Sequence, residues 1–163
     1  MYYHLITDHH LPVSLTKAWD FFSDPRNLSL ITPPEMDFRI TSSLTPKVYP
    51  GQIITYRVKP IWGIAVDWVT EITHVHEPHY FIDTQLHGPY KFWHHEHHFQ
   101  EVKDGVFMRD VLYYELPLGF LGDWIHRFWV RRQIQYIFNF RGKRLTELFS
   151  TVHNGTAQTT KTG

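Results

Sequence analysis

The segment KFWHHEHHFQ, residues 91–100, places four histidines and one glutamate in five consecutive positions between aromatic residues. Imidazole can bind a metal ion, exchange a proton near neutral pH, or hydrogen-bond to a ligand inside a pocket. Because side chains alternate along an extended strand, His95 and His97 share one face, with Cα atoms about 6–7 Å apart. This spacing permits both rings to hold one metal ion, with Asp110 as a candidate third ligand. Nitrogen and oxygen ligands of this kind suit zinc or iron(II).

Two other interpretations of this segment stay open. A histidine–aspartate pair in an apolar cavity can act as acid and base, as cyclisation or dehydration of a polyketide-like substrate requires. His95, His97 and Asp110 are the candidate catalytic residues for that chemistry. The same groups can instead form a hydrogen-bonded network in the wall of a ligand pocket. The sequence favours the network, because it contains no nucleophile elbow or phosphate loop, and we expect neither a resident metal nor a cofactor.

The composition narrows the classes of function. A chain of 163 residues is the size of one domain, and its 17% aromatic content suits a bulky core or the wall of an apolar cavity. Sixteen basic residues balance sixteen acidic ones, so nucleic acid is not an expected partner. The absence of cysteine excludes disulfides and thiolate chemistry. With no recognisable signal peptide and no apolar run of roughly 18 residues, we expect a cytoplasmic protein without membrane insertion.

Hydrophobic periodicity predicts an α+β domain over residues 1–149. A strand at 2–10 precedes a helix that Ser14 caps and Asp24-Pro25 ends, followed by a second short helix over about 25–31. A long amphipathic helix is predicted from Phe120 to Phe149, and residues 150–163 are expected to be a flexible tail. Between these helices, alternation and turn residues predict six antiparallel strands at 36–43, 52–59, 64–75, 79–86, 90–102 and 106–115.

The order of these elements and four phrases indicate a known fold. The phrases are FFSDPRNLSLITPP (21–34), FIDTQLHGPYKFWHHEHHF (81–99), GVFMRDVLYYELPLGFLG (105–122) and IFNFRGKRL (137–145). With them the chain resembles the START-like, or SRPBCC, superfamily of Bet v 1-like helix-grip domains, and within it a bacterial polyketide cyclase/dehydrase-like group. The resemblance implies a curved sheet of about seven strands around the C-terminal helix. It also implies a cavity for a small hydrophobic molecule, either aromatic, acyl or lipid-like.

Strand alternation and the resemblance together assign side chains to this cavity. We expect Asp110 to point inward and to contact His95 or His97, because a buried carboxylate requires hydrogen bonds or a cation. The outer face of the same strand then carries Glu96 between His94 and His98. The predicted ligand-binding residues are Trp68, Phe81, Asp83, Gln85, Trp93, His95, His97, Phe99, Met108, Asp110, Leu112, Tyr114, Trp124 and Phe128.

Two features near the C-terminus have competing interpretations. The apolar segment 117–129, which includes Trp124 and Phe128, is either a lid over the cavity mouth or packing at the start of the helix. Basic residues recur along the long helix, and charges on an amphipathic helix are usually on its solvated face. These basic residues are Arg127, Arg131, Arg132, Arg141, Lys143 and Arg144. The sequence gives no indication of the oligomeric state.

Overall fold

The computed structural model describes residues 1–61, 63–117 and 126–155. Its strands are β1 (Tyr2–Leu11), β2 (Arg39–Ile40), β3 (Gln52–Ile61), β4 (Ile64–His76), β5 (Tyr80–His87), β6 (Phe92–Val102) and β7 (Gly105–Glu115). Its helices are α1 (Leu15–Phe22), the 3₁₀ turns η1 (Pro25–Ile31) and η2 (Pro34–Met36), the π-helical turn η3 (His126–Val130) and α3 (Arg131–Gly155). Among the described residues, no helix has the length and apolar character needed to cross a membrane.

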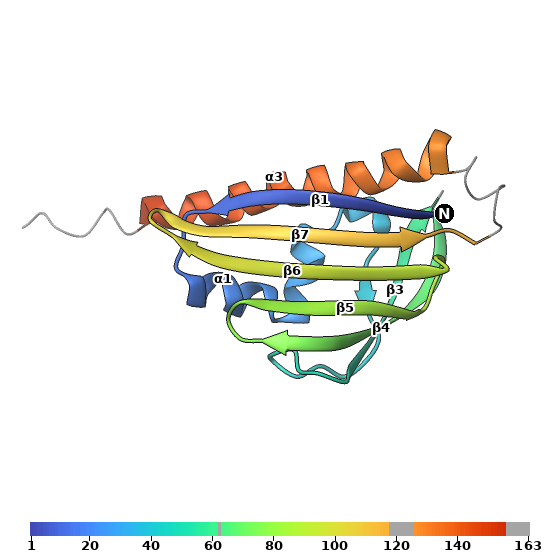
Figure 1. The fold of residues 1–163 in the computed structure, drawn as a ribbon, viewed down its shortest axis with the longest axis horizontal. Helices are drawn as coiled ribbons and strands as arrows, with labels where there is room; N and C mark the ends of the chain where they lie inside the picture. The colour runs from blue at the N-terminus through green and yellow to red at the C-terminus, as the bar shows by residue number, and fades with distance from the viewer. Residues whose placement is uncertain (62, 118–125, 156–163) are drawn as a thin grey trace, which may run out of the picture.

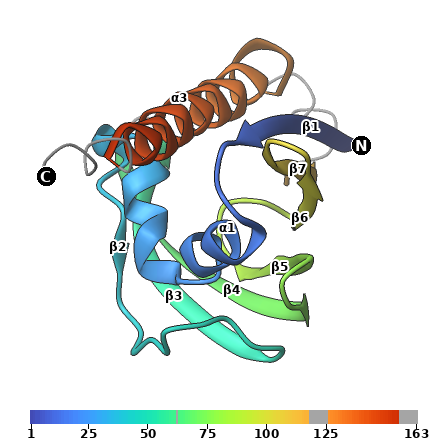
Figure 2. The same ribbon diagram turned by 90° about the vertical axis from the view of Figure 1, so that its left-hand side faces the viewer.

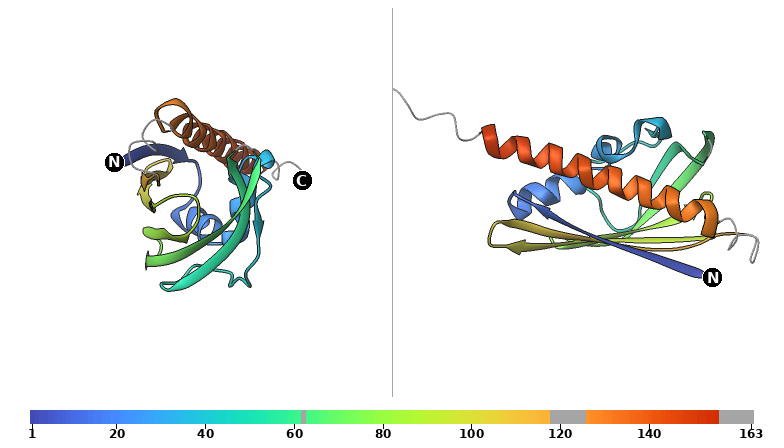
Figure 3. Two further views of the ribbon diagram at one scale, coloured as in Figure 1. Left: turned by 90° about the vertical axis from the view of Figure 1, so that its right-hand side faces the viewer. Right: turned by 90° about the horizontal axis from the view of Figure 1, so that it is seen from above.

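The seven strands form one antiparallel sheet in the order β1-β7-β6-β5-β4-β3-β2 (Figure 1). Consecutive strands are neighbours, as their short connections predict, while the first strand crosses over to pair with the last. Viewed from its end, the sheet curls into a trough (Figure 2). Helix α3 runs along the open side of the trough and α1 closes one end (Figures 2 and 3). The helix-grip architecture is therefore confirmed.

Local sequence explains how α1 begins and packs. Ser14 adopts an extended conformation, and its hydroxyl accepts a hydrogen bond from the backbone N–H of Lys17, as predicted for an N-cap. Ala18, Trp19 and Phe22 form the buried face of the helix. Trp19 lies edge-on to Phe81 and Phe99 of the sheet. The short helix thus fills one end of the trough.

The predicted hairpin between the last two strands is present, and it approaches β1 closely. Val102 pairs with Gly105, and the register continues to Phe92 opposite Glu115. Gly105 has a φ of 141°, and a Cβ there would lie 2.1 Å from the carbonyl oxygen of Leu11. Glycine is therefore required at the corner where β7 meets the end of β1.

Two predicted boundaries were wrong. The strand expected over 36–43 is reduced to Arg39–Ile40, because η2 ends at Asp37 in the left-handed conformation (φ 46°), which interrupts an extended backbone. The long helix continues to Gly155 rather than ending at 149, so the first part of the expected tail is helical. The proposed lid lies mostly in residues 118–125, which are outside the described residues.

The buried side chains form two clusters along the trough. The first surrounds Trp19 and Phe99 near α1, and the second surrounds Trp68 and Tyr114 near the start of α3. Helix α3 contributes to both, with Leu145 in the first and Phe138 in the second. The space between the clusters is where a cavity forms.

Candidate functional site

A cavity of about 190 Å³ lies between the sheet and α3, and side chains from both clusters line it. Its wall is mostly apolar and rich in rings, including those of Tyr56, Trp68, Tyr90, Trp93 and Phe138. Neighbouring rings contact one another, since Tyr56 stacks on Trp68 and Trp68 lies edge-on to Trp93. Contacts between aromatic rings favour stacked or edge-on geometry, so each ring restricts the orientation of the next.

Three polar side chains of the wall, those of Asp83, His95 and His97, lie together on the sheet. In the strand register, Asp83 of β5 lies opposite His95 of β6, while His97 of β6 lies opposite Asp110 of β7. His97 lies between the two carboxylates, with its Nδ1 2.7 Å from Asp110 Oδ1 and its Nε2 3.0 Å from Asp83 Oδ2. The predicted contact of Asp110 with a histidine is confirmed.

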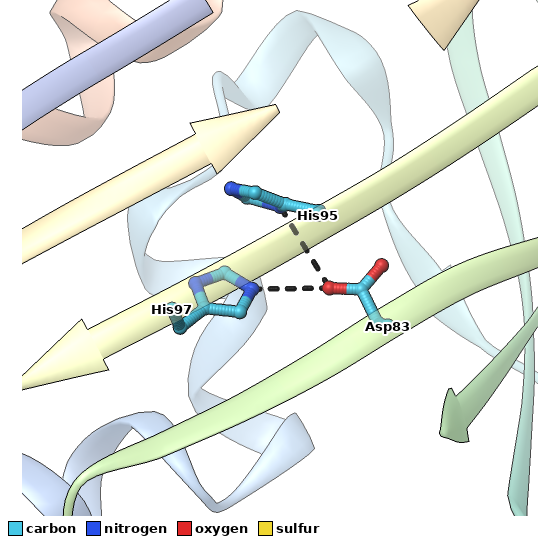
Figure 4. Close-up of side chains that lie close together, drawn as sticks. All are labelled: Asp83, His95 and His97. Carbon is cyan, nitrogen blue, oxygen red and sulfur yellow. Dashed lines mark hydrogen bonds and ion pairs between the residues drawn. The ribbon is translucent and has the colours of Figure 1, made fainter. Parts of the chain in front are cut away.

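His95 faces the same two carboxylates at longer distances. Its Nδ1 is 3.7 Å from Asp83 Oδ2, and its Nε2 is 3.4 Å from Asp110 Oδ1 without the geometry of a hydrogen bond. The rings of His95 and His97 lie side by side with centroids 4.0 Å apart. Figure 4 shows both rings turned toward Asp83. We refer to Asp83, His95, His97 and Asp110 as the His–Asp cluster.

Arg141 of α3 completes the charge distribution around the cluster. Its Nε lies 3.8 Å from the fully buried Asp110 Oδ2, and its guanidinium also lies over the rings of Phe22 and Phe138. Only 8% of Arg141 is exposed, so the prediction of a solvated basic residue was wrong at this position. Burial raises the pKa of Asp110, but Arg141 and the two histidines outweigh burial and hold this pKa well below its usual range.

The two histidines differ in their protonation because they differ in their partners. Burial lowers the pKa of His97, yet its hydrogen bonds with Asp110 and Asp83 outweigh burial, so the net shift is upward. For His95, burial and the neighbouring His97 lower the pKa. The cluster therefore pairs one imidazole that favours its cation with one that favours its neutral form. Such a set can hydrogen-bond to a ligand, transfer a proton, or ligate a metal ion.

The structure brings together part of the predicted ligand-binding set. Trp68, Phe81, Asp83, Trp93, His95 and His97 line the cavity. Asp110 lies behind the two histidines and does not line it. Other predicted residues point inward but serve the core and do not line the cavity, namely Phe99, Met108, Leu112 and Tyr114.

The remaining predicted residues are elsewhere. The amide of Gln85 bonds to the backbone of Tyr90 in place of facing the cavity. Phe128 is 59% exposed, so its assignment to the cavity was wrong. Trp124 lies outside the described residues. On the outer face of β6, Glu96 contacts His94 and His98, as alternation predicted.

Sequence reasoning missed the residues of the wall that come from β3 and α3. Tyr56 lies within a predicted strand, but no motif around it indicates a site. In the structure its hydroxyl bonds to that of Thr70 at 3.0 Å. Arg141 stands three residues after Phe138 and four before Leu145. That spacing puts it on the apolar stripe of the helix, which was a readable signal of burial.

Comparison with known proteins finds solved structures of the same fold. No family model and no curated protein matches the chain. Protein CV1439 from Chromobacterium violaceum has a TM-score of 0.68 at 11% identity, covering 90% of this chain and 96% of that one. Ginseng major latex-like protein 151 from Panax ginseng has a TM-score of 0.66 at 14% identity, covering 91% and 98%. Protein Ms6760 from Mycobacterium smegmatis has a TM-score of 0.61 at 21% identity, covering 89% and 92%. These similarities show a shared fold.

Proposed function

We propose that this chain, which has the Bet v 1-like helix-grip fold of the SRPBCC superfamily, binds a small aromatic molecule in the cavity between its sheet and α3. The observation that carries the proposal is the distribution of apolar and polar side chains in the cavity wall. Most of the wall consists of rings and aliphatic side chains, and Asp83, His95 and His97 form a polar patch on its sheet side. Further polar side chains line the cavity but bond within residues 21–32, namely Asp24, Asn27 and Thr32. An apolar cavity with a few convergent polar groups is the usual form of a small-molecule site.

The size of the cavity narrows the ligand class. Drug-sized ligands occupy pockets of about 300–1,000 Å³, whereas an engineered apolar cavity of about 150 Å³ holds benzene. At about 190 Å³, the space suits one or two fused rings better than a sterol or a long acyl chain. The ring would pack against Trp68 and Tyr56, and a single polar substituent would hydrogen-bond to His95, His97 or Asp83.

Calorimetric titration with a panel of phenol, indole, 2-naphthol and a sterol tests the ligand class. We expect saturable binding of the small ring compounds with one site per chain, and no binding of the sterol. Naphthalene, which lacks the hydroxyl of 2-naphthol, should bind more weakly than 2-naphthol. Failure of every small ring compound to bind would overturn the proposal.

A pair of adjacent residues on β3 provides a matched test of the location. Ile54 lines the cavity and is 6% exposed, whereas its neighbour Ile53 is 43% exposed on the opposite face. Ile54→Trp should fill the cavity and abolish binding of 2-naphthol, while Ile53→Trp should leave it unchanged. Equal binding by both variants would place the ligand elsewhere, and circular dichroism of each variant checks that the fold is retained.

Acid–base catalysis is the second candidate function. The observation favouring it is the 2.7 Å contact between His97 and the buried carboxylate of Asp110 at the cavity wall. In a cyclase or dehydratase this pair would remove a proton from one carbon and return it to a leaving oxygen. Incubation with aromatic polyketide precursors, followed by mass spectrometry for the loss of one water, tests it. Product formed equally by His97→Gln would exclude the pair.

A further inference from the structure

The cavity-facing atoms of the His–Asp cluster have the arrangement of a metal site. One ligand atom each from Asp83, His95 and His97 lies within 4.8 Å of the other two. Two ligands bound tetrahedrally to zinc at about 2.0–2.1 Å are roughly 3.3–3.4 Å apart. The separations here, 3.0 Å from Asp83 Oδ2 to His97 Nε2 and 3.7 Å from Asp83 Oδ2 to His95 Nδ1, lie on either side of that value. Small rotations of the side chains would therefore suffice to hold one ion.

The ring nitrogens that face away from this point have a partner of their own. Asp110 Oδ1 lies 2.7 Å from His97 Nδ1 and 3.4 Å from His95 Nε2. One carboxylate thus faces the outer nitrogens of both rings, while the inner nitrogens converge on Asp83. Metal-ligating histidines almost always donate the other N–H to a carboxylate or carbonyl, which fixes the tautomer and the orientation of the ring.

Charge and packing support the same arrangement. Arg141 lies beside Asp110 and compensates its charge, so the carboxylate of Asp83 supplies the negative charge that faces a dication. The ion would take the place of the proton between His97 Nε2 and Asp83 Oδ2. Phe81 stacks on His97 with centroids 4.3 Å apart, which restricts the rotation of that ring. All three candidate ligands line the cavity, so the remaining coordination positions would face its interior.

We propose that Asp83, His95 and His97 form a site for a divalent transition-metal ion of the zinc or iron(II) type, with Asp110 as the positioning carboxylate. The ligand set differs from the one considered on the sequence alone, because Asp110 lies on the outer side of the rings and Asp83 takes its place. Two histidines and one carboxylate with open positions are a known donor set for these metals. The inference concerns the ion alone and does not require an organic ligand.

Titration of Zn²⁺ into chelator-treated protein tests the site. With thirteen histidines in the chain, surface binding is the main confounding signal, and the outer face of β6 offers a matched control. His94 and His98 contact Glu96 on that face in a His-x-Glu-x-His arrangement, away from the cavity. The double variant His94→Gln/His98→Gln should keep one tight Zn²⁺ equivalent. Asp83→Asn and His95→Gln should each weaken it by more than about 100-fold, since second-shell changes alone cost about 10–100-fold.

Two readouts make the outcome decisive. Co²⁺ in place of Zn²⁺ should give the visible absorption bands of a four- or five-coordinate ion, and these should disappear in both inner-face variants. Thermal unfolding of each apo variant checks that the fold survives, and either inner-face variant suffices if the other does not fold. The proposal is overturned if the tight equivalent is absent from the parent protein, survives in Asp83→Asn or His95→Gln, or is lost in His94→Gln/His98→Gln.

Discussion

Replacement of Arg141 by methionine tests whether the buried charges of the site hold α3 against the sheet. Arg141 is the cation from α3 beside Asp110, at 3.8 Å, and Asp110 is fully buried. Methionine keeps much of the length of the side chain and its contacts with Phe22 and Phe138, but removes the charge. The change therefore isolates the electrostatic contribution of the guanidinium from its packing.

The expected loss follows from the geometry. Breaking a buried pair by removing one partner costs about 3–5 kcal/mol, because the other charge is left uncompensated. His97 remains bonded to Asp110, which favours the lower end of that range. The two ring contacts of the guanidinium, at 5.7 and 6.0 Å, lie near the outer limit for a cation–π interaction. We therefore expect Arg141→Met to lower the free energy of unfolding by about 3 kcal/mol.

Urea denaturation measures this loss, and Arg144 on the same helix supplies the control. Arg144 pairs with Glu147 on the surface, so Arg144→Met should cost at most about 1 kcal/mol. The double variant Asp110→Asn/Arg141→Met should cost less than the sum of the single changes. In the double variant Asp110→Asn removes the buried carboxylate that Arg141→Met alone leaves without its cation. A loss below about 1 kcal/mol for Arg141→Met, equal to that of Arg144→Met, would refute the reasoning.

Two further predictions concern β1 and its neighbours. Burial and the nearby charge of Arg141 lower the pKa of His9, while Asp110 and Asp8 oppose this shift. The contribution of His9 to stability is therefore present above about pH 6.5 and is lost as the pH falls below that value. His9→Gln should reduce the acid destabilisation seen in urea denaturation at different pH values, and an unchanged pH profile would contradict this. Gly105→Ala should lower the melting temperature more than Gly51→Ala, because only the first Cβ meets a backbone oxygen. Equal shifts in melting temperature would contradict the close approach.

The parts of the site that could be predicted depend on the alternation of side chains along a strand and on the pairing of neighbouring strands. Once residues 92–102 are taken as a strand, alternation places His95 and His97 on one face and Glu96 on the other, and the resemblance to helix-grip domains indicates which face is inward. The hairpin turn at Asp104-Gly105 then fixes the register that brings Asp110 opposite His97. With the inner face taken from the resemblance, short-range rules predict the contact of His97 with Asp110, because it depends on adjacent strands only.

The parts that could not be predicted depend on long-range packing. The register of α3 along the trough decides that Arg141 meets Asp110, and no local pattern specifies that distance. The same holds for Met108 and Leu112, which point to the inner face as predicted but are covered by core packing, so that they do not reach the cavity. The strand determines whether a side chain points inward. Whether that side chain reaches a cavity depends on the other side chains that pack over it.

A crystal structure of the protein with 2-naphthol tests the central claim most directly, because it reports both the location and the orientation of the ligand. We predict that the fused rings lie between Tyr56, Trp68 and Phe138, with the hydroxyl within hydrogen-bonding distance of His95, His97 or Asp83. A ligand bound only on the outer surface would contradict the account. So would a ligand in the cavity whose hydroxyl points away from the His–Asp cluster.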